Sequence, residues 1–395
     1  MSGILNNVYS NAIIALGRHS EALMRLQEQA STGSRVNRPS DDPSAAYYIL
    51  TLNSENRSLE NYINALAGVT GTLQVSSSII GQMASVVSQA RVSMTQITSG
   101  IYDQDGRDRV AEAIDSSLEQ LVQLANTKHN DQYLFGGGDT GTAPFAVERI
   151  NGEITAVTYQ GSYETRNINV ASGISSSAFY VGQEMFSSDQ RGEPVFLGDT
   201  GAAAGTGTSS VTGDVWLTVT FDGSNYQVSI DDGATFVTVP VGGDANQAVT
   251  DSRTGKVLYV DTTGINSTGV ELVRVSGTYD AFGALIEIRN LLRNDRNLSD
   301  PQLEQLRNAS IGSLEEIQNL LAQKQTSIGL RIGFLDGIKS SLEDVKFNTE
   351  DETSRLEEAD IAQVAIDLSR HEALYQMSLA VAGKLMSLSL LDFIE

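Results

Sequence analysis

The most constraining feature of this 395-residue chain is a seven-residue apolar repeat between Leu59 and Ile101. One row of the repeat contains Leu59, Leu66, Leu73, Ile80, Val87, Met94 and Ile101, and a companion row contains Tyr62, Val69, Ser76, Met83, Ala90 and Ile97. Heptads sustained over this length, with a single polar lapse at Ser76, predict a long α-helix in coiled-coil-like packing. As a helix, the segment would extend roughly 65 Å.

A second seven-residue repeat near the other end of the chain predicts a partner for that helix. Its main row contains Leu314, Leu321, Ile328, Leu335 and Leu342, and its companion row contains Ile317, Lys324, Arg331, Ile338 and Val345. The two basic residues indicate that one flank of this helix is less buried than the other. Ser299-Asp300-Pro301 has the residue types that begin a helix, and a shorter helix is expected at about 107–127.

Between these helical regions the apolar residues change to a period of two, which is typical of β-strands. Residues 215–221, 226–230 and 236–239 alternate in this way and are separated by Asp-Gly turns, so they predict antiparallel hairpins. Residues 256–260 and 269–275 continue the pattern. The Gly-, Ala- and Thr-rich segment 198–210 is expected to be a flexible loop without packing content.

Amphipathic helical patterns occupy both ends of the chain, over residues 4–33 and 359–394. The apolar face of the second helix is too wide for one partner helix to cover, so we expect neighbouring subunits to cover the remainder. Helices of this kind would become ordered on assembly. The residues that we expect to form the assembly surface include Leu5, Leu16, Leu23, Leu26, Leu368, Leu374, Met377, Val381, Leu385 and Leu388.

The composition argues against several functional classes. A net charge of -23 disfavours nucleic acid as a partner. The absence of cysteine excludes disulfides, thiolate metal sites and cysteine nucleophiles. His19, His129 and His371 are far apart in sequence and match no metalloenzyme motif, so packing or surface roles are expected for them. No catalytic, cofactor-binding or metal-binding residue is predicted, and an enzyme is the least favoured class.

The two terminal segments also bear on localisation. The N-terminus lacks the basic start, the apolar run and the small-residue cleavage site of a signal peptide. Residues 373–391 are rich in apolar residues, but Lys384 near their centre would cost roughly 2.5–3.5 kcal/mol in a membrane. We therefore expect a packing helix there, and not a membrane protein; if the chain leaves the cell, it does so without a cleavable signal.

Three segments resemble the bacterial flagellin family. The first, similar to the N-terminal signature and closest in wording to the hook-associated members, is Gln29-Ala30-Ser31-Thr32-Gly33-Ser34-Arg35-Val36 with Pro39-Ser40-Asp41-Asp42-Pro43. The second, similar to the exit from the helical domain, is Tyr133-Leu134-Phe135-Gly136-Gly137 with Thr142-Ala143-Pro144-Phe145. The third, similar to the paired terminal helix, is Asp360-Ile361-Ala362 with Leu390-Leu391-Asp392-Phe393-Ile394, and it lacks the Pro-Gln-x-Val-Leu ending common in flagellins.

The resemblance covers about residues 1–150 and 280–395 and implies an α+β, multidomain fold. The expected parts are discontinuous helical terminal and rod domains, with long coiled-coil-like helices, and an inserted antiparallel β-rich outer domain. Their boundaries would be 1–45 with 350–395 for the terminal assembly domain, 46–145 with 279–349 for the rod, and 146–278 for the outer domain. The resemblance, together with their spacing, also suggests that Arg35, Asp41 and Asp42 fix a subunit contact.

For function, the resemblance implies a structural, non-enzymatic adaptor of the extracellular flagellum at the hook–filament junction. The implied partners are further copies of the chain in a ring-like layer, hook-associated protein 1, flagellin, an export chaperone and the type III export apparatus. Two alternatives stay open. The chain could be a filament-forming flagellin, or its β-rich region could be an adhesion module that binds a glycan through Trp216 and scattered tyrosines.

Overall fold

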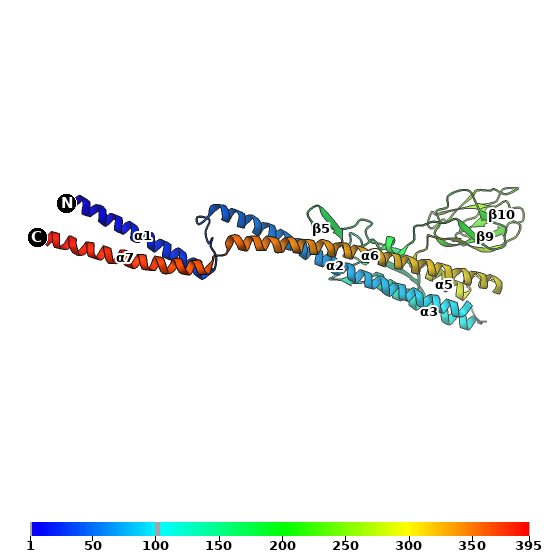
Figure 1. The fold of residues 1–395 in the computed structure, drawn as a ribbon. Helices are drawn as coiled ribbons and strands as arrows, with labels where there is room; N and C mark the ends of the chain where they lie inside the picture. The colour runs from blue at the N-terminus through cyan, green and yellow to red at the C-terminus, as the bar shows by residue number, and fades with distance from the viewer. Residues whose placement is uncertain (1, 99–102, 395) are drawn as a thin grey trace. The chain divides into compact units, whose positions relative to one another are not determined.

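The computed structural model describes the backbone of residues 2–98 and 103–394 and the side chains of residues 10–97 and 103–384 (Figure 1). It combines long helices with antiparallel sheets, so the predicted α+β, multidomain class is confirmed. The chain divides into two compact units. Unit 1 contains residues 1–64 and 338–395, and unit 2 contains residues 65–337. The finer division of the chain into a terminal, a rod and an outer domain stays a prediction.

The predicted helices are present, and their ends follow the sequence signals. The helices are α1 (Ser2–Thr32), α2 (Pro43–Thr98), α3 (Gln104–Ala125), α4 (Gly182–Phe186), α5 (Ala281–Arg293), α6 (Asp300–Glu357) and α7 (Ile361–Ile394). The prolines at or near the start of α2 and α6 suit the first turn of a helix, where no intrahelical N–H bond is lost. Helix α2 begins well before the apolar repeat at Leu59, because the cap at Asp42 and not the repeat sets its first residue.

The middle parts of the two heptad rows lie in the helical core of unit 2, whereas Leu59 and Leu342 belong to unit 1 and Ile101 lies outside the described residues. On α2, Leu66, Leu73 and Ile80 have no exposed area, and on α6 the same holds for Leu314 and Leu321. The polar lapse in the first row is absorbed, because the Ser76 hydroxyl donates to the Thr72 carbonyl within its own helix at 3.0 Å. The two helices approach each other where Gln325 Nε2 lies 3.4 Å from the Ser77 carbonyl oxygen. Lys324 and Arg331 remain partly exposed, as the prediction of a less buried flank requires.

The antiparallel hairpins predicted from the period-two pattern are also confirmed. A five-stranded sheet has the order β11-β10-β9-β14-β7, with strands Val237–Thr238, Tyr226–Ser229, Gly213–Phe221, Gly269–Val275 and Pro194–Leu197. A three-stranded sheet has the order β12-β13-β8, with strands Gln247–Thr250, Val257–Asp261 and Ala203–Ala204. Leu217, Val228, Leu258 and Val273 are fully buried in a shared core, so the two sheets pack as one body.

Three two-stranded ribbons accompany these sheets. They pair β1 with β2 (Lys128–His129, Gln132–Tyr133), β3 with β4 (Phe145–Ile150, Glu153–Tyr159) and β5 with β6 (Asn167–Ala171, Ile174–Ser177). Strand β4 and helix α3 both pack against α5, whose residues Leu285 and Leu292 are fully buried. The β3–β4 ribbon therefore packs against the helical part of unit 2.

The prediction of a flexible loop without packing content at 198–210 is wrong. Strand β8 in this segment pairs with β13, and the side chain of Thr200 is only 2% exposed. The Thr200 hydroxyl donates to Glu271, and the backbone N–H of Gly207 donates to Asn246 Oδ1 at 2.6 Å. A run of small residues is typical of a flexible loop, whereas here these residues let the backbone pass close to neighbouring strands.

A membrane tail finds no support in the helices. Among the residues that the structure describes, no helix combines the length and the apolar content that crossing a membrane demands.

Candidate assembly surface

The two terminal helices pack along each other within unit 1. Helices α1 and α7 run side by side, with the two chain ends at the same end of the pair (Figure 1). Leu26 and Val364 are buried in the seam between them, at 8% and 7% exposed. The predicted surface residues Leu16, Leu23, Leu368 and Leu374 are half-buried. Two helices therefore bury only part of the apolar stripes predicted from the sequence.

Large apolar side chains remain on the outer face of this helix pair. Met377 and Val381, both predicted as assembly residues, are 64% and 53% exposed. Others on the pair that are at least 47% exposed are Ile13, Ile14, Met24, Ile361, Ile366 and Leu379. So many exposed apolar residues on two helices are unusual for a monomer. The side chains of Leu5, Leu385 and Leu388 lie outside the described residues.

The loop between α1 and α2 turns on Gly33. Its φ of 73° is the left-handed conformation that ends many helices, and its N–H donates to the Gln29 carbonyl at 2.9 Å, as a helix C-cap requires. The loop is then fastened to the connection between α6 and α7. Gly33 accepts a bond from the Ala359 N–H at 2.9 Å, and the Arg35 N–H donates to the Glu357 carbonyl at 2.6 Å. Backbone bonds thus join the two connections within unit 1.

The predicted charged residues of this loop have distinct roles. Arg35 pairs with Asp42 at 3.1 Å, as its spacing suggested, and also donates to the Leu356 carbonyl. Asp42 Oδ1 caps α2 by accepting the Ala45 N–H at 3.0 Å. That backbone bond, followed by the bond from Arg35, lowers the pKa of Asp42 below its ordinary value. Asp41 instead accepts the backbone N–H of Arg38 at 2.8 Å, so it holds the loop, and it forms no ion pair with any residue that the structure describes.

A groove adjoins this loop, on the side of the helix pair. It has a volume of about 340 Å³ and is lined by Arg25, Leu26, Gln29, Arg35, Asp41, Asp42, Ala359, Asp360, Gln363, Val364 and Asp367. The predicted residues Arg35, Asp41, Asp42 and Leu26 therefore meet at one surface feature. The α7 lining could not be predicted, since more than 300 positions separate it from the loop in sequence.

An exposed aromatic patch at the start of α2 was missed by the sequence analysis. Tyr47, Tyr48 and Leu50 are 69%, 61% and 66% exposed, whereas the neighbouring Ala46 and Ile49 are buried. Consecutive residues in a helix point in different directions. The pair Tyr47-Tyr48 therefore indicated in the sequence that an aromatic side chain could be exposed. The patch lies in unit 1, beside the capped start of α2. It adds to the exposed apolar surface of unit 1.

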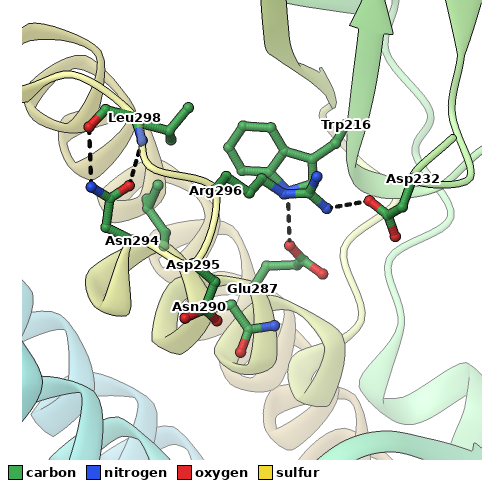
Figure 2. A pocket seen from close by; sticks show the side chains of 9 residues that line it. Trp216, Asp232, Glu287, Asn290, Asn294, Asp295, Arg296 and Leu298 are labelled. Carbon is green, nitrogen blue, oxygen red and sulfur yellow. Dashed lines mark hydrogen bonds and ion pairs between the residues drawn. The ribbon is translucent and has the colours of Figure 1, made fainter.

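A separate cavity in unit 2 tests the adhesion alternative. It has a volume of about 380 Å³ and includes Trp216, which is only 9% exposed (Figure 2). The guanidinium of Arg296 lies over the indole ring, 4.6 Å from its centre, and pairs with Asp232 at 2.6 Å. The indole N–H donates to Glu287 at 3.3 Å. A sugar cannot stack on a ring that Arg296 already covers, so Trp216 does not offer the binding platform considered from the sequence.

Comparison with known proteins identifies the N-terminal part of the chain. A family model for the bacterial flagellin N-terminal helical region matches residues 4–140. Over these residues the chain is similar to the bacterial flagellin family. The match contains the loop with Arg35, Asp41 and Asp42, as well as α1, α2 and α3. The resemblance inferred from the sequence signature is thereby confirmed.

Two curated relatives within the flagellin family are flagellar hook-associated proteins 3. The protein from Escherichia coli is 34% identical over 127 residues, which are 32% of this chain and 40% of that protein. The protein from Salmonella typhimurium is 33% identical over 123 residues, or 31% of this chain and 39% of that protein. The chain therefore spans about 40% of the length of the curated relatives that it matches.

A solved structure with the same fold extends the likeness beyond the N-terminal region. Flagellar hook associated protein-3 from Legionella pneumophila matches with a TM-score of 0.54 at 16% identity, covering 78% of this chain and 98% of that one. At this identity the match concerns the fold alone. It supports the α+β architecture that the sequence predicted.

Proposed function

We propose that this chain is a structural, non-enzymatic adaptor of the bacterial flagellum, which joins the hook-associated layer to the flagellin filament. The observation that carries the proposal is the match of residues 4–140 to the flagellin family, together with 34% identity to a flagellar hook-associated protein 3. The related proteins bear a name that places them in the flagellum, and the fold of this chain is similar to that of flagellar hook associated protein-3 from Legionella pneumophila.

The geometry of unit 1 supports assembly through the chain ends. The α1–α7 pair buries Leu26 and Val364 but leaves Met377 and Val381 mostly exposed. Covering these side chains with another subunit would contribute roughly 25 cal/mol for each Å² of apolar surface removed from water. We therefore assign assembly to the outer face of α1 and α7, with the Arg35–Asp42 loop holding the end of the pair.

The domain roles follow from this assignment. Residues 1–45 with 350–395 would form the assembling layer, residues 46–145 with 279–349 the rod, and residues 146–278 the outer domain. The partners would be further copies of the chain, hook-associated protein 1, flagellin, and an export chaperone with the type III export apparatus. The chain would act outside the cell and would be exported without a cleavable signal peptide.

Deletion of the gene tests the proposal against flagellin, its nearest alternative. We expect electron microscopy to find hooks without filaments and an assay of the medium to find flagellin as free monomer. Bare hooks without free flagellin in the medium would instead favour a filament-forming subunit. Intact filaments would reject both functions. Restoring the wild-type gene controls for effects on neighbouring genes.

A further inference from the structure

His19 and His371 are 352 positions apart in sequence and meet in the seam between α1 and α7. Their Nδ1 atoms are 3.4 Å apart, whereas their ring centres are 5.6 Å apart and the ring planes are inclined by 56°. Because the two nitrogens are much closer than the ring centres, the imidazoles meet through their Nδ1 edges and are not stacked. The sequence predicts only packing or surface roles for these residues, since no motif brings them together.

A direct hydrogen bond explains this contact poorly. Bonds from an N–H group normally span about 2.7–3.2 Å between heavy atoms, so a separation of 3.4 Å is long. A shared metal ion explains it better. Zinc binds histidine nitrogen at about 2.0–2.1 Å in tetrahedral geometry, which places two such nitrogens about 3.3–3.4 Å apart. The observed separation of 3.4 Å between the two Nδ1 atoms agrees with this value.

The surroundings suit metal binding between two fixed helices. Both histidines are half-buried, and the half-buried Leu16, Leu23 and Leu368 lie within one turn of them on the same helices. Within the described part of the chain, neither imidazole makes a hydrogen bond to a group other than its partner histidine. The Nδ1 lone pairs are thus not committed to a carbonyl or a carboxylate. Neutral imidazole is a ligand that suits zinc, copper and nickel.

We propose that His19 and His371 form a two-histidine site for a divalent transition metal, with Zn²⁺ as the reference ion. The metal would link α1 to α7 near the middle of the contact between the two helices. Among the residues that the structure describes, no three His, Asp or Glu side chains converge on one point, so water would fill the remaining coordination positions. This makes the site weaker than a four-ligand structural zinc site, and dependent on the pairing of the two helices.

Isothermal titration calorimetry of the full chain with Zn²⁺ tests the proposal. We expect one zinc ion per chain, and an affinity that falls at least about tenfold in His19→Ala and in His371→Ala. The matched control is His129→Ala, which removes the chain's third histidine from strand β1 in unit 2. This control should bind zinc like the wild type. Absence of zinc binding, an unchanged affinity in either seam variant, or an equal loss in the control would overturn the proposal.

A second variant separates ligation from folding. His19→Leu places an apolar side chain in the seam, where it should preserve the α1–α7 pair. With zinc, the wild type should gain helix content by circular dichroism or melt at a higher temperature. The leucine variant should show neither change, although its helix content without zinc is at least that of the wild type. A zinc response retained in His19→Leu would mean that the seam does not hold the metal.

Discussion

Arg35 Nη1 lies 3.1 Å from Asp42 Oδ2, within the loop that joins the first two helices. The same arginine reaches the Leu356 carbonyl at 3.1 Å, and the same aspartate caps α2 through the Ala45 N–H at 3.0 Å. One ion pair therefore couples the start of α2 to the connection between α6 and α7. A change at either residue should affect both connections within unit 1.

Substitution of Asp42 separates its two roles. Asp42→Ala removes both the helix cap and the ion pair, whereas Asp42→Asn keeps a side chain that caps helices well. We expect thermal stability and swimming motility to decrease in the order wild type, Asn variant, Ala variant. Ser40→Ala, an exposed change in the same loop, should match the wild type. Normal melting and motility in Asp42→Ala would refute a contact role for this residue.

The outer face of α7 should matter for assembly and not for the stability of the free chain. Met377 is 64% exposed, and glutamine has a helix propensity similar to that of methionine. Met377→Gln should therefore change the free energy of unfolding by less than about 0.5 kcal/mol. Motility and filament number per cell should nevertheless fall. Unimpaired motility in this variant would place the assembly surface elsewhere, and a large loss of stability would place Met377 in the core.

The heptad core of unit 2 can be tested by replacing leucine with alanine at a buried and at an exposed position of α6. Leu321 is fully buried and Leu330 is 73% exposed. Leu321→Ala should destabilise unit 2 by about 2–5 kcal/mol because it leaves a cavity in a packed core. Leu330→Ala should cost about 0.5 kcal/mol or less. Chemical denaturation measures both, and similar losses at the two positions would contradict the assigned register of the repeat.

The long-range pattern of apolar residues was enough to predict most of the helices and the main strands. Period seven fixed the buried faces of α2 and α6, since Leu66, Ile80 and Leu321 all have no exposed area. Alternation with Asp-Gly turns fixed the β9–β10–β11 hairpins in the same way. Each of these patterns lies within one continuous segment of the sequence, so it can be recognised without knowing which segments contact each other in the fold.

The pairing of long helices could be predicted from their repeats, but the individual side-chain contacts between distant segments could not. The Arg35 bond to Leu356 and the approach of His19 to His371 depend on pairing between chain ends, which no local pattern encodes. The segment around Thr200 failed for another reason. Its composition resembles a linker, but a buried hydrogen bond to Glu271 gives it a fixed place that hydropathy does not reveal.

The single tryptophan of the chain reports on the cavity in unit 2. Arg296 covers the Trp216 ring at 4.6 Å, a contact worth about 0.5–1 kcal/mol when partly exposed to water. Arg296→Ala should uncover the indole, shift its fluorescence emission to the red and increase quenching by iodide. Arg253→Ala, which removes the other arginine on Asp232 but leaves the ring covered, is the control. Identical spectra in Arg296→Ala and wild type would show that Arg296 does not shield the ring.

Glu271 on β14 predicts a specific dependence of stability on pH. Its side chain is 2% exposed; the Thr200 hydroxyl donates to one carboxylate oxygen, while Oε2 has no partner among the described residues. Burial raises the pKa of Glu271 above its ordinary value of 4.5. The folded chain therefore holds this proton more tightly than the unfolded chain. The resulting stabilisation is complete below the ordinary pKa and is lost as pH rises through the folded value.

Glu271→Gln cannot titrate, so it should lack this component of the pH dependence. We expect the wild type to lose stability relative to the variant as pH rises from 4.5 towards neutrality. At neutral pH the variant should be the more stable chain, because it avoids a buried negative charge. Urea unfolding across this range measures the difference. Glu193→Gln, at an exposed position before β7, should leave the pH profile unchanged. Parallel profiles for wild type and Glu271→Gln would mean that Glu271 stays ionised in the fold.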